Sequence, residues 1–245
     1  MILRNSLLII CISILCVGCK SKKDDDTIIP AKELYAKGVE SFDKQKYKNA
    51  AEDFAKIYFQ HPGSPLSARA EIMEAYSLYL AGEYDEATDV LDIFIKIHPL
   101  HEDIAYVYYL KALSYYMQIS NSSHDQSKTE QAKIAFSDVI SKFSGTKYAK
   151  DAALKMGLVN DHLAGAEMNI GRFYLAQNNP IAAGGRFEVV IRDYQTTSHA
   201  AEALYRMVES YMMLGLPEEA KKYAAVLGHN YPESSWYKRS FNLIK

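Results

Sequence analysis

The sequence predicts an all-α protein built from repeated pairs of helices. From residue 31 onward, apolar residues recur at positions i, i+3 and i+4, which is the spacing of a helix with one buried face. The chain has only seven prolines and lacks alternating runs rich in Val, Ile and Thr, so strands are not expected. A fixed arrangement of residues also returns along the chain, which is typical of a stacked helical array.

The repeated arrangement is centred on an alanine. A small residue lies twelve positions before it, a tyrosine three before, a large apolar residue four after and a proline twelve after. Small residues predict a close approach of two helices, and the proline predicts the end of the second helix, since proline cannot extend it. The first two clear frames are Gly38, Tyr47, Ala50, Phe54 and Pro62, then Ala75, Tyr84, Ala87, Leu91 and Pro99. A third, with Pro217 in place of the tyrosine, is Val208, Pro217, Ala220, Ala224 and Pro232.

Two further frames are degenerate, which brings the expected total to about five repeats. Around Ala132, the small residue Ala112 lies 20 positions upstream, and the extra residues predict a polar loop near 121–125. Around Ala183, the small residue is Gly171. Ser144 and Gln195 take the two proline positions. Phe54, Phe136 and Phe187 are expected to fill the seams to the following repeats.

Three local patterns refine this prediction. Asn179-Pro180 and Leu216-Pro217 predict helix starts, because proline is favoured at the first helical position. Gly184-Gly185 lies inside a predicted helix, where each glycine costs roughly 1 kcal/mol relative to alanine. We interpret this pair as a point of close packing, with a local kink as the alternative.

The N-terminus reads as an export signal. Arg4 precedes an apolar run over residues 7–17, which is shorter than the ~20 residues of a membrane-spanning helix. The run closes at Gly18-Cys19 and the chain then turns polar. A small residue directly before a cysteine resembles the processing site of bacterial lipoproteins, although Cys16 stands where that pattern prefers leucine. We therefore predict a signal peptide (1–18), a lipidated tether (19–30) and a helical solenoid (31–245); the alternative is an uncleaved signal anchor.

Cysteine usage agrees with a lipoprotein. All three cysteines lie within the first 19 residues, so cleavage would leave only Cys19, without a disulfide partner in the chain. The resemblance to bacterial lipoproteins implies a diacylglycerol and an N-acyl chain on Cys19, and two or more chains hold a protein stably on a membrane. No aspartate follows the cysteine, which in many Gram-negative species directs a lipoprotein to the outer membrane.

The sequence carries no signature of catalysis, and we expect neither an enzyme nor a bound cofactor. It contains no phosphate-binding loop, no nucleophile elbow and no Cys/His metal spacing. We interpret His98 and His101 as a surface turn, Asp24-Asp25-Asp26 as part of a solvated linker, and Asp161-His162 as a helical pair without a nucleophile. A formal net charge of −2 gives no electrostatic basis for a nucleic-acid partner.

The repeat frames resemble the tetratricopeptide repeat over most of residues 31–245. A lipoprotein made only of about five such repeats, with an insertion in the third, is similar to the lipoprotein family of the outer-membrane β-barrel assembly machinery. The phrases that carry this similarity lie at residues 33–38, 47–54, 132–140, 166–174 and 192–194. The third-frame phrase at 132–140 and the helix before Phe173 are the most specific.

In tetratricopeptide repeats the first helix of each pair lines a groove. Transferring the groove positions of the family to the first three frames yields a surface rich in tyrosine, which suits an extended peptide with aromatic side chains. The alternative is that these tyrosines only pack between helices. The expected groove residues are Tyr35, Phe42, Arg69, Tyr76, Tyr79, Tyr106, Tyr109 and Tyr116, with Val39, Ile72 and Leu113; the fourth-frame equivalents are Met168, Arg172, Leu175 and Ala176.

The family resemblance implies a non-enzymatic role on the periplasmic face of the outer membrane. Its partners would be the core barrel subunit of the assembly machinery, accessory lipoproteins and unfolded outer-membrane proteins, and its lipid would anchor it to the membrane. We expect the first three repeats to bind unfolded clients and the last two to dock on the core subunit. The alternative is another periplasmic tetratricopeptide-repeat scaffold that coordinates the envelope or cell division.

Overall fold

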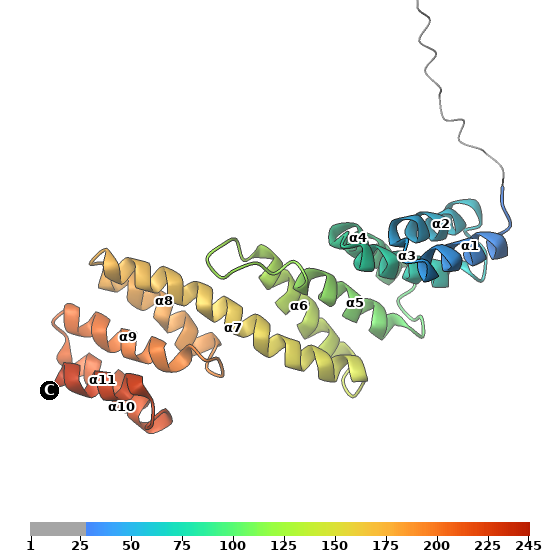
Figure 1. Ribbon diagram of the computed structural model, residues 1–245. Coiled ribbons are helices and arrows are strands. Elements are labelled where there is room, and N and C mark those ends of the chain that lie inside the picture. The colour runs from blue at the N-terminus through green and yellow to red at the C-terminus, as the bar shows by residue number, and fades with distance from the viewer. Residues whose placement is uncertain (1–27) are drawn as a thin grey trace, which may run out of the picture.

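The computed structural model describes residues 28–245, and these residues form eleven α-helices joined by short connections (Figure 1). Each helix packs against the next, so that the first ten form five consecutive pairs and the last closes the array. This arrangement confirms the predicted all-α fold of five repeats. The helices are α1 (Ala31–Asp43), α2 (Tyr47–Gln60), α3 (Ser67–Ala81), α4 (Tyr84–Ile97), α5 (Ile104–Tyr116), α6 (Ser127–Lys142), α7 (Lys147–Ala176), α8 (Pro180–Asp193), α9 (Ala200–Met213), α10 (Pro217–Asn230) and α11 (Ser235–Ile244).

Several helices begin or end close to the prolines and capping residues that predicted their boundaries. Helix α8 begins at Pro180, and the side-chain oxygen of Asn179 accepts a hydrogen bond from the backbone N–H of Ala182 at 3.2 Å. Helix α10 likewise begins at Pro217. Helices α2, α4 and α10 each end two residues before the prolines that predicted their ends, Pro62, Pro99 and Pro232.

Small residues let the two helices of a pair approach closely, as predicted. A Cβ atom built on Gly38 of α1 would lie 2.7 Å from the ring of Phe54 on α2. One built on Gly171 of α7 would lie 2.3 Å from the ring of Phe187 on α8. The central alanines of all five frames are fully buried: Ala50, Ala87, Ala132, Ala183 and Ala220.

The large residues of the frame share core clusters with the following repeats, and they also pack on the first helix of their own repeat. The rings of Phe54 and Phe187 lie over the glycine of their own repeat. Phe136 contacts Tyr116, also of its own repeat, at 5.8 Å between ring centroids. In the first and fourth repeats the missing side chain of the glycine leaves room for the ring from the facing helix. Phe54 shares a core cluster with Ala70 of the next repeat.

The glycine pair of α8 is not a point of close packing, so that prediction was wrong. A Cβ atom on Gly185 would meet no atom within 4 Å, and one on Gly184 only Met207 at an ordinary contact distance of 3.7 Å. Helix α8 continues through both residues. The pair instead lines a cavity of about 320 Å³ between α8, α9 and α10.

Helix α7 was not foreseen as one element of 30 residues. It packs against α5, α6 and α8, and therefore connects the third repeat to the fourth. In Figure 1 it runs across the middle of an elongated molecule, with α1 and α11 at opposite ends. The predicted polar loop is present between α5 and α6, and Ser122 in it accepts a hydrogen bond from the side chain of Asn169 on α7 at 3.1 Å.

Within residues 28–245, no helix is both long enough and apolar enough to cross a membrane. The residues directly before α1 are held to the end of α2: the backbone N–H of Ile29 donates to the side chain of Gln60 at 3.2 Å. The predicted signal peptide and Cys19 lie outside the described residues.

Candidate functional site

The eight expected groove residues lie on the first helices of three successive pairs. All of them are half-buried except Arg69, which is exposed, so the rings keep some surface accessible to solvent. Two are on α1, three on α3 and three on α5. In chain order they are Tyr35, Phe42, Arg69, Tyr76, Tyr79, Tyr106, Tyr109 and Tyr116.

Five of these rings join a sixth in a continuous row that crosses three repeats. The ring of Phe42 on α1 lies 5.7 Å from that of Tyr76 on α3, and Tyr76 lies 6.4 Å from Tyr106 on α5. Tyr79 stacks on Tyr76 at 6.4 Å with nearly parallel planes. The row continues through Tyr148 at the start of α7. We call this row the aromatic strip: Phe42, Tyr76, Tyr79, Tyr106, Tyr109 and Tyr148.

Tyr148 was missed by sequence reasoning, although its ring lies 5.7 Å from Tyr106 and 5.3 Å from Tyr109. It belongs to the first turn of α7, in a stretch that matches no position of the repeat frame. Only the folding of α7 back onto α5 brings it to the strip. The one signal available in the sequence was a tyrosine two residues after Thr146, the N-cap of α7, and it does not predict a tertiary neighbour.

The remaining groove residues pack against neighbouring helices and do not join the strip. The ring of Tyr35 lies 5.4 Å from Phe54, with the guanidinium of Arg69 5.9 Å from the centre of the Tyr35 ring. Tyr116 lies against Phe136. Ile72 is buried in the core between α3 and its neighbours. The alternative that the expected groove residues only pack between helices therefore fits Tyr35, Tyr116 and Ile72 better than it fits the residues of the strip.

The strip ends at a polar group. The hydroxyl of Tyr109 donates a hydrogen bond to the carboxylate of Asp151 on α7, and Lys155 pairs with the same carboxylate at 3.1 Å. Burial raises the pKa of Tyr109, and the neighbouring carboxylate raises it further. Burial likewise raises the pKa of Tyr106. Both hydroxyls stay neutral at physiological pH. The Tyr106 hydroxyl can donate a hydrogen bond to a peptide backbone, whereas the Tyr109 hydroxyl already donates to Asp151 and can only accept one.

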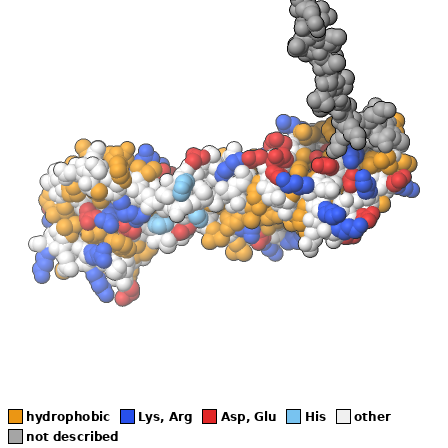
Figure 2. All heavy atoms as spheres, turned by 45° about the horizontal axis from the view of Figure 1, so that its top comes forward, with side chains coloured by type: hydrophobic (Ala, Val, Ile, Leu, Met, Phe, Trp, Pro, Cys, Tyr) orange, Lys and Arg blue, Asp and Glu red, His pale blue; other side chains and the backbone are white. Residues whose placement is uncertain are grey.

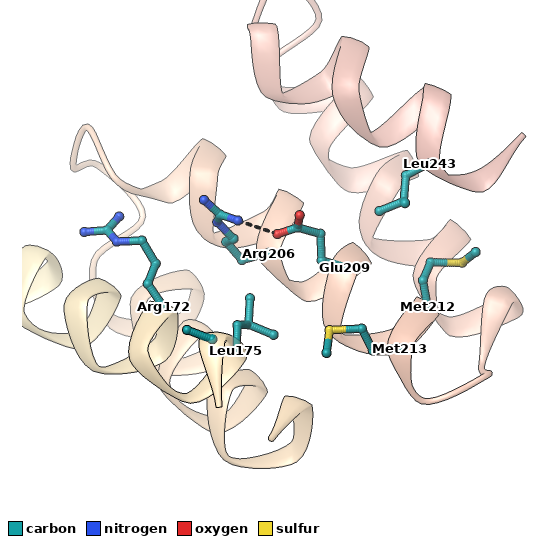
Figure 3. Close-up of a pocket in the computed structure, with 8 residues that line it drawn as sticks. Arg172, Leu175, Arg206, Glu209, Met212, Met213 and Leu243 are labelled. Carbon is teal, nitrogen blue, oxygen red and sulfur yellow. Dashed lines mark hydrogen bonds and ion pairs between the residues drawn. The ribbon is translucent and has the colours of Figure 1, made fainter. Parts of the chain in front are cut away.

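Three of the four residues at the groove positions of the fourth repeat line a pocket. Met168 is fully buried, but Arg172, Leu175 and Ala176 line a pocket of about 660 Å³ between α7, α9 and α11 (Figure 3). Its other lining residues are Arg206, Glu209, Met212, Met213 and Leu243. No aromatic residue lines it, in contrast to the strip. We call it the C-terminal pocket.

An ion-pair network forms the polar side of the C-terminal pocket. Arg172 donates to both oxygens of Glu202 at 3.1 Å and to the side-chain oxygen of Asn169 at 2.7 Å. Arg206 lies between Glu202, at 3.1 Å, and Glu209, at 2.7 Å. The network therefore ties α7 to α9 beside the loop of the third repeat.

The described residues show no arrangement of three or more His, Cys, Asp or Glu side chains that could hold a metal ion. The rings of His98 and His101 both pack on Phe94, with 4.9 and 5.3 Å between ring centroids.

Figure 2 shows hydrophobic side chains gathered toward the middle of the molecule on the face in view. In the middle helix α7, Leu154 and Leu158 are exposed.

Comparison with known proteins places this geometry in a family. A family model described as outer membrane lipoprotein, YfiO, matches residues 28–227. The chain is 61% identical over 229 residues to the outer membrane protein assembly factor BamD of Rickettsia prowazekii, covering 93% of this chain and 91% of that protein. It is 42% identical over 231 residues to the assembly factor BamD of Caulobacter vibrioides, covering 93% and 76%. Among solved structures, the tetratricopeptide-repeat domain of P58(IPK) is similar with a TM-score of 0.46 and 14% identity, covering 87% of this chain and 55% of that one.

Proposed function

This chain belongs to the BamD family of outer membrane lipoproteins, and from this premise we propose how its repeats divide the work of outer-membrane-protein assembly. It is an assembly factor of the outer membrane and not an enzyme, and its family makes it a subunit of the β-barrel assembly complex. The first three repeats receive unfolded outer-membrane proteins, and the last two dock on the core barrel subunit and accessory lipoproteins. The alternative of a division or envelope scaffold has no support among these relatives.

The aromatic strip is the observation that supports client binding. Its six half-buried rings run across α1, α3, α5 and α7, and they offer apolar area at low entropic cost. Unfolded barrel proteins present extended strands with alternate apolar side chains and unpaired backbone groups. Tyrosine suits both parts, because its ring contacts the side chains and its hydroxyl bonds to the backbone.

Changing Tyr76 and Tyr109 together to alanine is expected to weaken client binding. The double variant removes one ring from the middle of the strip and the polar contact at its end, so affinity for a peptide copied from the C-terminal strand of a barrel protein should fall about tenfold or more. Fluorescence anisotropy measures that affinity, and co-purification measures association with the core subunit, which should persist.

The matched control changes two half-buried tyrosines outside the strip, Tyr58 and Tyr231, to alanine. The control should bind the peptide as the unaltered chain does, and circular dichroism should show helix content unchanged in both variants. Equal peptide binding in strip and control variants would contradict client binding at the strip, as would loss of both activities with the helices intact.

The lipid anchor is the third part of the proposal. We propose cleavage before Cys19, lipid on its sulfur and amino group, and a tether to residue 30. Changing Cys19 to serine should abolish lipid attachment, because the thioether needs the thiol; metabolic labelling with a radioactive fatty acid measures this. Cys16→Leu is the control, since it matches the lipoprotein pattern better and should be labelled normally. Labelling of the Cys19→Ser variant would contradict the assigned cleavage site.

A further inference from the structure

The C-terminal pocket, with a volume of about 660 Å³, is larger than the cavity of about 320 Å³ beside the glycine pair of α8, and the client-binding strip does not include it. Its residues come from the first helices of the fourth and fifth repeats and from the closing helix α11, so it lies entirely within the docking half of the molecule. In Figure 3 the arginine side chains and the methionine side chains extend from opposite ends of the opening. The pocket therefore presents a charged side and an apolar side to one occupant.

The apolar side is aliphatic and adaptable. Leu175 and Ala176 of α7 face Met212 and Met213 of α9 and Leu243 of α11. Met213 and Leu243 keep 47% and 38% of their surface exposed, although both are large apolar residues. Methionine is unbranched and polarizable, so it adjusts to side chains of different shape. This wall suits leucine- or methionine-sized side chains rather than the aromatic side chains that the strip is built to contact.

The charged side carries a surplus of positive charge. Arg172 and Arg206 line the pocket and pair with Glu202 and Glu209, and Arg239 lies one helical turn before the lining residue Leu243 on α11. Arg239 lies 4.8 Å from the centre of the Trp236 ring and has no ion pair among residues 28–245. Arg206, 5.7 Å from the same ring, bonds to the two glutamates through Nε and Nη1 only. Guanidinium groups with unused N–H donors are arranged to receive a carboxylate.

We propose that the C-terminal pocket binds a linear segment of a partner subunit in which an acidic side chain lies next to aliphatic ones. The carboxylate is held by the arginine side, and the aliphatic side chains lie on the methionine and leucine wall. This inference rests on the docking role proposed for the last two repeats, and it names the surface and the chemistry of that docking. Charge complementarity selects the occupant, because a basic or strongly aromatic segment leaves one side of the pocket unmatched.

Two labelled peptides test the chemistry of the pocket on the purified full chain in detergent. One alternates glutamate with leucine and is amide-capped, and the second has lysine in place of each glutamate. The acidic peptide should bind about tenfold or more tightly than the basic one. Changing Met213 to glutamate removes part of the wall and adds a repelling charge, so it should weaken the acidic peptide by a similar factor. Arg172→Gln should also weaken binding of the acidic peptide, and it does so by removing a positive charge without adding a negative one.

Met117→Glu is the matched control, since Met117 is 50% exposed at the end of α5 and lies far from the pocket along the chain. It makes the same chemical change and should leave binding unaltered. Equal affinity for the two peptides, or equal effects of Met213→Glu and Met117→Glu, would overturn the proposal. So would displacement of the acidic peptide by a client strand peptide, since that would make the pocket a second client site.

Co-purification from detergent-solubilised membranes separates this inference from the function it rests on. If the unaltered chain does not retain the core subunit, the docking role itself fails. If the unaltered chain retains partner subunits and the Met213→Glu variant retains them equally well, docking stands and its assignment to the pocket is wrong. Loss of a partner subunit in Met213→Glu, but not in Met117→Glu, supports the inference.

Discussion

Replacing Gly171 with alanine should destabilise the protein by about 3 kcal/mol, although alanine is the better helix former. The added Cβ atom would lie 2.3 Å from the ring of Phe187, which is fully buried in the core. Overpacking of this kind costs more than the roughly 1 kcal/mol that alanine contributes to helix stability. Thermal melting followed by circular dichroism should show a midpoint lower by about 6 to 12 °C.

A glycine-to-alanine substitution elsewhere in α7 should have the opposite effect on stability. A Cβ atom on Gly157 would meet no atom within 4 Å, so Gly157→Ala adds helix propensity without a clash and should stabilise by about 0.5–1 kcal/mol. Both glycines lie in one helix, so the pair isolates the effect of the facing ring. If both variants shifted the midpoint in the same direction, the packing of α7 on α8 described here would be incorrect.

Glu74 of α3 should make the protein less stable as the pH rises. Burial, together with a smaller effect of the neighbouring Glu71 carboxylate, raises the pKa of Glu74 to about 7. Glu71 is itself buried and lies 3.6 Å from the ring nitrogen of His98. The folded protein therefore holds a proton on Glu74 at a pH where the unfolded chain has released it. The contribution of Glu74 to the free energy of unfolding should fall between about pH 4.5 and pH 7, by at most on the order of 3 kcal/mol.

Glu74→Gln tests directly whether ionisation of Glu74 lowers stability as the pH rises, because the glutamine amide never carries a negative charge. The variant and the unaltered chain should melt at similar temperatures at pH 5, and the variant should melt higher at pH 8. Comparing the two proteins at each pH removes the contributions of groups common to both, including the pair of Glu71 with His98. A difference in melting temperature that stays constant with pH would show that Glu74 does not titrate in this range.

The long helix α7 explains why the two halves form one array. It begins beside the aromatic strip, where Tyr148 joins the row of rings, and ends at the C-terminal pocket, where it contributes Leu175 and Ala176. Along the way it packs on α5, α6 and α8. The proposed client site and the proposed docking site therefore share one continuous element of secondary structure.

The sequence by itself determined the fold class, the five helix pairs and most helix ends. The reason is that a repeat is defined by local spacing: Gly38 and Ala50, or Gly171 and Ala183, lie a fixed number of residues apart in helices that are adjacent in the chain. Prolines act on their own helix as well, so Pro62 or Pro217 could be interpreted without knowledge of the rest of the molecule. The expected groove positions also lie on the first helices, because the family pattern specifies a place within each pair.

Only the tertiary structure decided which of these residues form a site. Tyr76, Tyr106 and Tyr148 come from three different helices, and their contact depends on how far each pair rotates against the next. The sequence does not state that angle, which is why Tyr148 was missed and the glycine pair of α8 was misread. The continuity of α7 was equally hidden, since glycines at 157, 165 and 171 lower its helix propensity and its packing on three neighbours maintains it. Local chemistry sets what each residue can do, and the stacking of distant helices sets which residues do it together.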